Sequence, residues 1–407
     1  MASSAVRKAS SQVCSTVCAS CFRPMHRFAP VITESLSLPI SLHIISSSSR
    51  PAARLPSIIM LKRLSLGVFV GVTKLLSQDD QLYIRQSADS DLKVFAGLSH
   101  RELAAEVAGH LGVQLGRVAI TKFVDGETKV RVLDDVSDRD VFVVQSITAP
   151  VNDSLVELLF LISSLKTAHC KRVIAVIPFL AYTNRDHKLP GNDAILGADV
   201  VRMLEVMGAD VVVSIDFHSP YVKGFFHVPT INLTALPLGA SYFAGKRLTR
   251  PLVLSLTFSG FTRANAFQGE LRAQGVECDI GILPYNLDVG ELEQYRQSGL
   301  LPKDLQNRDI ILVTDAIVTG RSCVQAVHLL RRHDVGRIYM FATHGIMLDT
   351  ALGDINETSL TELVLTNTLP LKQETWNVRQ LSVAKLLAEA IRRARRDEQT
   401  VSEYTNQ

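Results

Sequence analysis

Residues 310–322 form the segment of this sequence whose residue types and spacing best suit phosphate binding. A buried apolar strand runs into a Thr-Gly-x-Ser turn at which a helix begins. At such a turn the free N–H groups and the positive end of the helix dipole bind an anion, and Gly320 lets the backbone approach it closely. The hydroxyls of Thr319 and Ser322 would add hydrogen bonds, and Arg321 a charge-assisted contact. The segment predicts a phosphate site, although the same residues also fit an ordinary helix start with Ser322 as its N-cap.

A histidine supplies the second candidate for chemistry. Asp216 and His218 follow a β-rich apolar run at residues 210–215. Ligands of parallel α/β sheets bind at the carboxyl ends of strands, and a histidine there can carry a proton near neutral pH. A lone histidine at a strand end can also be satisfied by its neighbours, so this interpretation depends on the motifs around it.

The elements that must position these residues alternate from Lys93 onward, with short apolar strands between helices. Continuous apolar strands separated by helices predict parallel sheets covered on both faces, and hence an α/β fold. Two such blocks, divided near residues 236–238, predict two similar α/β domains. We expect strands at 141–144, 173–177, 210–215, 252–256, 310–313, 337–343 and 362–365, and helices at 101–111, 198–207, 263–274 and 323–332.

Two further expectations concern helix ends and packing. Ser99 is the expected N-cap of the first helix. The final helix carries Val383, Leu387 and Ile391 on one face, which predicts that it packs back onto one of the domains.

Charge along the chain is uneven. Residues 1–78 hold nine Lys or Arg against a single acid, Glu34, whereas the other 329 residues carry 34 basic and 39 acidic side chains. This mildly acidic body argues against a nucleic-acid partner, which needs a clustered basic face. No apolar stretch approaches the ~20 residues needed to cross a bilayer, which argues against a membrane protein.

The basic, Ser-rich start of the chain is typical of an organellar transit peptide. We therefore expect residues 1–90 to be a targeting or disordered leader, and the protein to be cytoplasmic or organellar. Met60 is a plausible alternative start, in which case residues 1–59 would not belong to the mature protein. The cysteines within apolar runs are expected to be buried thiols in a reducing compartment: Cys170, Cys278 and Cys323.

Several segments, in one order, resemble the phosphoribosyl-pyrophosphate synthetase family. Residues 123–128 (Phe-Val-Asp-Gly-Glu-Thr) are similar to the family's adenine-contacting hairpin, and residues 216–219 to its Asp-Leu-His-Ala strand end. The series is completed by residues 152–155, 310–322, 343–345 and 366–370. The similarity covers roughly residues 92–395, and several motifs in one order are more specific than any one of them.

The resemblance implies a fold of two phosphoribosyltransferase-type domains with parallel sheets covered by helices. The N-terminal domain, residues 91–236, would be the ATP side, and residues 237–370 the ribose-phosphate side, followed by a C-terminal helix and tail at 371–407. The implied reaction transfers the β,γ-pyrophosphoryl group of ATP to the 1-hydroxyl of ribose 5-phosphate, with Mg²⁺. Members of the family usually assemble into hexamers.

The resemblance also implies roles for individual residues. His218 would be catalytic and, with Asp315, a ligand of Mg²⁺. His344 is expected to be structural. The implied ATP-binding residues are Phe123, Asp125, Glu127 and Arg185, and the implied ribose-phosphate-binding residues are Asp315, Thr319, Gly320, Arg321 and Ser322. The two acids of the hairpin also fit a solvated turn with no ligand.

This sequence departs from the family pattern where charge matters most. Family aspartates are replaced at four positions: Thr314, Val318, Ile231 and Thr257. Residues 283–289 stand where the family's flexible catalytic loop carries a Lys and an Arg, and they contain neither. Asn184 and Arg185 align with an Arg-Gln pair, so that the Arg is displaced by one position. Because pyrophosphoryl transfer needs metal and basic side chains on the transferring group, catalysis is expected to be impaired.

Three interpretations remain at this point. The first is an impaired family member that binds ATP and ribose 5-phosphate and joins paralogous synthetase subunits in a homo- or hetero-oligomer as a regulatory subunit. The second is an active, divergent ribose-phosphate diphosphokinase in which Arg185, Arg321 or Arg296 substitutes for the lost groups. The third is a phosphoribosyltransferase-like enzyme, which Thr314 disfavours and which leaves the hairpin motif unexplained.

Overall fold

The computed structural model describes residues 92–183, 194–284, 294–348, 350–371, 375 and 377–396. The expectations for the leader at 1–90, for Asn184 and Arg185, and for most of the 283–289 segment concern residues outside these ranges.

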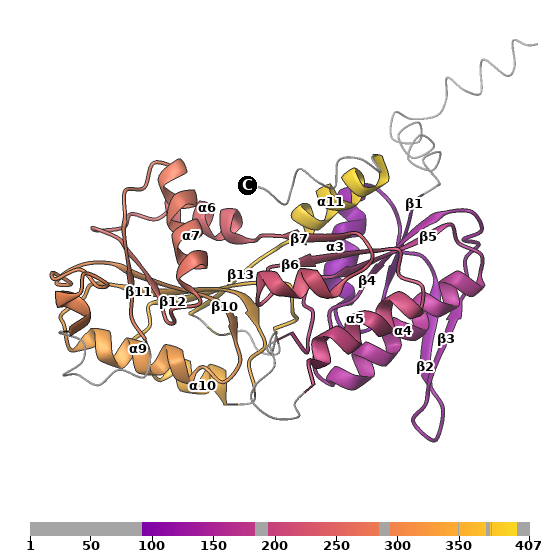
Figure 1. Ribbon diagram of the computed structural model, residues 1–407, viewed down its shortest axis with the longest axis horizontal. Helices are drawn as coiled ribbons and strands as arrows, with labels where there is room; N and C mark the ends of the chain where they lie inside the picture. The colour runs from indigo at the N-terminus through magenta and orange to yellow at the C-terminus, as the bar shows by residue number, and fades with distance from the viewer. Residues whose placement is uncertain are drawn as a thin grey trace, which may run out of the picture. The chain divides into compact units, whose positions relative to one another are not determined.

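The N-terminal half is built on a five-stranded parallel sheet (Figure 1). Its strands are β-branched or apolar through most of their length and are buried on both faces, the pattern of a fully covered parallel sheet. The strand order is β1 (Leu92–Ala96), β4 (Asp140–Val144), β5 (Arg172–Ile177), β6 (Val211–Ile215) and β7 (Thr230–Leu233).

Helices cover both faces of this sheet. Helices α4 (Val151–Thr167) and α5 (Leu196–Val206) lie on one face, and α3 (Arg101–Leu111) on the other. The C-terminal helix α11 (Ala384–Arg396) lies beside α3, and Leu387 and Ile391 join the apolar core that α3 forms with β1 and β4 (Figure 1). The predicted return of the last helix is therefore confirmed, and it returns to the N-terminal half.

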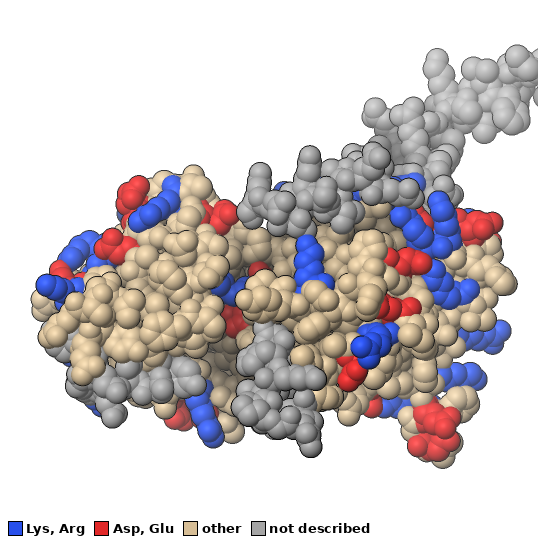
Figure 2. Space-filling view, in the orientation of Figure 1, with Lys and Arg blue, Asp and Glu red and all other residues tan. Residues whose placement is uncertain are grey.

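A two-stranded antiparallel hairpin, β2 (Val118–Lys122) and β3 (Thr128–Val132), packs on α4 and projects from this half (Figure 1). Its turn is closed by Gly126 at φ 92° and by Asp125 Oδ1, which accepts a hydrogen bond from the Glu127 N–H at 3.1 Å. Figure 2 shows acidic side chains gathered at the tip of this hairpin.

The C-terminal half contains a six-stranded parallel sheet. Helices α9 (Arg321–Arg331) and α10 (Ala351–Asn356) cover one face, and α6 (Leu236–Ala244) and α7 (Phe261–Ala273) cover the other. The strand order is β13 (Val378–Leu381), β12 (Glu362–Thr366), β11 (Ile338–Gly345), β10 (Ile310–Ile317), β8 (Leu252–Ser255) and β9 (Asp279–Ile282). The predicted α/β fold with parallel sheets covered by helices is confirmed. In the described part of the chain, no helix combines the length and apolar character needed to span a membrane.

The structure corrects several local expectations. The N-cap of α3 is His100 rather than Ser99, since His100 Nδ1 accepts from the Leu103 N–H at 3.4 Å. Ser99 Oγ instead bonds Gln145 Oε1 at 2.9 Å, a partner 46 residues away. Strands β10 and β11 also run further than predicted, so that His344 lies inside β11 rather than after it.

Candidate active site

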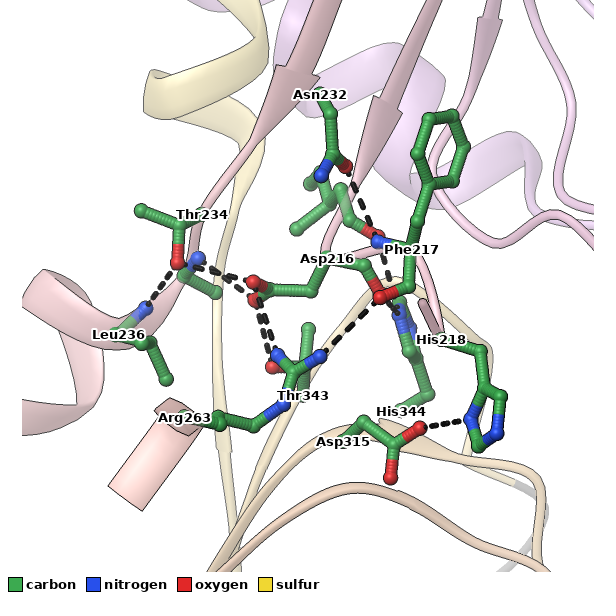
Figure 3. Close-up of polar contacts among 12 residues, drawn as sticks. Asp216, Phe217, His218, Asn232, Thr234, Leu236, Arg263, Asp315, Thr343 and His344 are labelled. Carbon is green, nitrogen blue, oxygen red and sulfur yellow. Dashed lines mark hydrogen bonds and ion pairs between the residues drawn. The ribbon is translucent and has the colours of Figure 1, made fainter. Parts of the chain in front are cut away.

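The candidate site lies where the carboxyl ends of strands from the two halves face each other (Figure 3). Residues 216–218 follow β6 of the N-terminal half, whereas Asp315 lies near the end of β10 and His344 near the end of β11. A small pocket at this junction is lined by His218, Asp315 and Ala316, and by Phe179 and Leu180 beyond β5. The site is therefore composed of residues from both halves.

His218 and Asp315 form the central pair of the pocket. His218 Nδ1 lies 2.5 Å from Asp315 Oδ2, with side-chain exposures of 44% and 18%. Burial alone would raise the pKa of Asp315, but the hydrogen bond with His218 and the positive charge of Arg263 outweigh it and hold the pKa well below its usual range. Asp315 is thus a carboxylate that accepts from His218, and its Oδ1 also accepts from Thr314 Oγ1 at 3.1 Å.

Asp216 is directed away from this pair and serves as a buried anchor. Its carboxylate accepts hydrogen bonds from Thr234 Oγ1 (2.9 Å), the Ala235 N–H (2.9 Å) and Thr343 Oγ1 (2.8 Å). Its own backbone has φ 44°, a left-handed conformation that costs a non-glycine residue about 1–3 kcal/mol. These contacts stabilise the turn that carries the chain from β6 to His218.

Arg263, in the first turn of α7, completes the anchor from the C-terminal half. Its Nη1 lies 3.1 Å from Asp216 Oδ1, and its Nη2 donates to the Phe217 carbonyl at 3.2 Å (Figure 3). Only 16% of the Arg263 side chain is exposed. Sequence reasoning missed Arg263, because nothing in its neighbourhood separates it from the other Lys and Arg residues of the chain.

His344 also lines the pocket and forms a second link between the halves. Its Nε2 contacts the carbonyls of Ile215 and Asp216 at 3.1 and 3.2 Å, and its Nδ1 contacts Thr368 Oγ1 at 2.9 Å. Complete burial lowers the pKa of His344, so the ring is neutral and donates from Nε2. The expected structural role of this histidine agrees with these contacts.

The phosphate loop at residues 318–320 joins β10 to α9. Gly320 is the N-cap of α9 with φ 70°, and no side chain caps the helix there. The alternative with Ser322 as N-cap is therefore wrong, since Ser322 is the second helical residue. Thr319 and Arg321 are exposed, and the first turn of α9 presents N–H groups as an anion site requires. Strand β10 contains Asp315 and runs directly into this loop, so both lie at the carboxyl end of the strand.

The three described residues assigned to ATP lie elsewhere. Phe123, Asp125 and Glu127 are at the tip of the hairpin, away from the carboxyl ends of β6 and β10 (Figure 1). Lys129 Nζ lies 5.3 Å from the centre of the half-exposed Phe123 ring. The role of this tip in ATP binding therefore stays a prediction. Arg185 lies outside the described residues.

Mg²⁺ prefers oxygen ligands and commonly binds through one or two carboxylates together with substrate phosphates and water. Among the described residues, no three His, Cys, Asp or Glu side chains gather into a metal-binding group. Asp315 fits the role of a single carboxylate ligand. His218 fits less well, because its Nδ1 is engaged by Asp315 and nitrogen is not a ligand that Mg²⁺ favours.

Paired parallel sheets with a glycine-capped helix start beside a His–Asp pair define a phosphoribosyltransferase-type α/β protein. Residues 92–208 match the family model for the N-terminal domain of ribose phosphate pyrophosphokinase, and residues 300–404 match that of the phosphoribosyl synthetase-associated domain. The ribose-phosphate pyrophosphokinase of Wolinella succinogenes is 33% identical over 306 residues, which cover 75% of this chain and 96% of that protein. That of Bacillus subtilis is 32% identical over 319 residues, covering 78% and 98%.

A solved structure agrees with these sequence relatives. The phosphoribosylpyrophosphate synthetase of Mycobacterium smegmatis superimposes with a TM-score of 0.67 at 30% identity, covering 75% of this chain and 99% of that one. The chain therefore belongs to the ribose-phosphate pyrophosphokinase, or phosphoribosyl-pyrophosphate synthetase, family.

Proposed function

We propose that this protein binds ATP and ribose 5-phosphate, turns them over weakly, and acts as a regulatory or associated subunit beside active paralogous synthetase chains. The observation that carries the proposal is the electrostatics of the pocket. Asp315 is the carboxylate that β10 offers there, and it is already engaged by His218. Thr314, Ala316 and Val318 around it are uncharged.

Weak turnover follows from what phosphoryl transfer requires. Catalysis of this reaction consists mainly of positioning the phosphates and stabilising their charge. Mg²⁺, held through Asp315 and the phosphates, would supply charge neutralisation when bound. The chain itself would hold the ribose phosphate at Thr319 and the first turn of α9, and would present His218 from the opposite half. Loss of the loop cations of residues 283–289 would cost ~10³–10⁵ in rate, by analogy with loss of an arginine finger.

A role beside other chains is supported by the surface of the N-terminal half. Helices α4 and α5 contact each other, and each exposes large apolar side chains to water. They include Phe160, Met203 and Val206, of which Val206 is 81% exposed. Burial of this face in a homo- or hetero-oligomer would remove it from water.

An assay of AMP release tests the proposal, with ATP, Mg²⁺ and ribose 5-phosphate supplied to the protein alone and mixed with an active paralogue. We expect slow release by the protein alone, and a changed rate per active subunit in the mixture together with co-elution of the two chains. Independent migration of the chains, with no change in rate, would rule out the subunit role.

An active but divergent enzyme is the second candidate, and one observation favours it. Arg321 is exposed at the first position of α9, where a guanidinium can meet a phosphate held by the helix N-terminus. Arg296, in contrast, contacts His333 Nδ1 at 3.2 Å, so its guanidinium is engaged in a contact within the protein. Turnover that is lost in Arg321→Ala and kept in Arg296→Ala would support this second candidate.

A further inference from the structure

Arg263, carried by the C-terminal half, forms an ion pair with the buried anchor Asp216 of the N-terminal half. Its ion pair with Asp216 is 3.1 Å long, and its charge is among the causes that lower the pKa of Asp315. The guanidinium of Arg263 is thus bonded directly to the buried anchor. Its planar fork is suited to bind two acceptors at once.

Arg263 also binds a second acceptor, which lies next to His218 in the chain. Arg263 Nη2 donates to the carbonyl of Phe217, the residue that directly precedes His218. In the preceding peptide group, the Phe217 N–H donates to Asn232 Oδ1 at 3.1 Å. The backbone that enters His218 is therefore fixed from both sides.

The backbone there needs such support because Asp216 is left-handed, with φ 44°. A strained conformation persists only when its surroundings over-determine it. Thr234 and Ala235 contribute contacts from the same half, whereas Thr343 and Arg263 contribute contacts from the other half. Arg263 alone among these four contacts both the Asp216 carboxylate and the Phe217 carbonyl.

We propose that Arg263 is a positioning residue: its guanidinium, carried by the C-terminal half, fixes residues 216–217 of the N-terminal half and thereby orients the His218 ring toward Asp315. The orientation of His218 then depends on the junction between the halves and is not a property of the N-terminal half alone. This inference deepens the proposed function, since it takes His218 as the residue that meets the ligand.

The test observes the His218 ring directly and uses no substrate, so its outcome is separate from that of the AMP-release assay. Full-length protein with ¹⁵N-labelled histidine rings is studied by long-range ¹H–¹⁵N NMR, with His218 assigned through His218→Asn. Asp315→Asn supplies the reference spectrum for a His218 that lacks its carboxylate partner. In Arg263→Gln we expect the His218 signals to move most of the way to that reference.

Arg272→Gln is the matched control. Arg272 lies on the same helix and donates from Nη2 to the Cys278 carbonyl at 3.0 Å, a contact at the other end of α7. We expect its loss to lower the melting temperature without moving the His218 signals. Equal movement in both variants would show a general loosening of α7 and would overturn the proposal.

Conservative change and chemical rescue separate positioning from simple stabilisation. Arg263→Lys keeps the charge but lacks the planar fork, so we expect His218 signals between those of wild type and Arg263→Gln. Methylguanidinium added to Arg263→Ala should return the signals toward wild type. Unchanged His218 signals in Arg263→Gln would refute the proposal, and failure of both the Gln and Lys variants to fold would assign Arg263 to folding instead.

Discussion

Thr343 Oγ1 donates a 2.8 Å hydrogen bond to Asp216 Oδ2, and this bond joins the carboxyl end of a strand in one half to the buried anchor of the other. Both residues are fully or nearly fully buried. The pocket that contains His218 and Asp315 thus lies above a polar junction whose groups are satisfied by each other. Such junctions are costly to disturb, because a buried acceptor left without its donor retains its desolvation penalty.

Thr343→Val should remove that donor at nearly constant volume. We expect the free energy of unfolding to fall by about 1–3 kcal/mol, the usual cost of leaving a buried polar group unpaired. Urea titration followed by circular dichroism measures the change. Thr121→Val, at an exposed position of β2, is the control and should stay within about 0.5 kcal/mol of wild type. Equal stability of Thr343→Val and wild type would contradict the role of this bond.

A buried carboxylate at the opposite end of the C-terminal sheet, paired with a half-exposed arginine, predicts a pH dependence. Asp309, with a side chain only 3% exposed, accepts from Arg337 Nη2 at 2.6 Å and from the Thr249 N–H at 2.7 Å. Burial would raise the pKa of Asp309, but the hydrogen bonds from Arg337 and Thr249 outweigh it, so the pKa lies below its usual value. A carboxyl with a lowered folded-state pKa stabilises the fold above its unfolded pKa of about 3.9 and loses that stabilisation as the pH falls further.

Asp309→Asn should therefore lower the free energy of unfolding at pH 7 by about 3 kcal/mol, the lower end of the cost of breaking a buried pair, because Arg337 is half exposed. The difference in free energy of unfolding between variant and wild type should become smaller below a pH of about 4. Unfolding titrations across this pH range measure the gap. Asp304→Asn removes an ion pair with Arg250 that is exposed on both sides, and should change stability little at any pH. A gap that stays constant as the pH falls would exclude the titration of Asp309 as its cause.

The phosphate loop predicts ribose 5-phosphate binding. Thr319→Ala combined with Ser322→Ala should weaken it, since each hydrogen bond to a charged acceptor is worth about 1.5–3 kcal/mol. Titration calorimetry of full-length protein measures the affinity, and Thr121→Ala serves as a control outside the loop. Identical affinities for the wild type and the double variant would remove this loop from the binding site.

The same account predicts what should restore activity. Thr314→Asp and Val318→Asp, with a Lys and an Arg introduced at residues 283–286, should raise AMP release above the wild-type rate. Recovery should be incomplete, because the loop geometry must also match the transferring group. The matched comparison is the pair of Asp substitutions without the loop cations. If the cations add nothing to that pair, their absence is not what limits the rate.

The strands at 141–144 and 310–313 could be predicted because a buried parallel strand carries its apolar run in its own sequence. The short strands β7, β9 and β13 lack such a run, because polar residues or a glycine stand among their apolar residues. The N-cap at His100 was missed because Gln145, distant in sequence, takes the Ser99 hydroxyl. His218 and Asp315 could be proposed from motifs, whereas Arg263 could not, because its partners are defined only by the meeting of the two halves.

The rate of AMP release by the purified protein alone, with saturating ATP, Mg²⁺ and ribose 5-phosphate, tests the central claim most directly. Each departure from the family pattern affects charge in the transition state more than binding in the ground state, so ligands can bind while turnover stays low. We predict a rate that is ~10³–10⁵ below that of an active paralogue measured beside it. Turnover at ~1–100 s⁻¹, the usual range of phosphoryl-transfer kinases, would contradict the account.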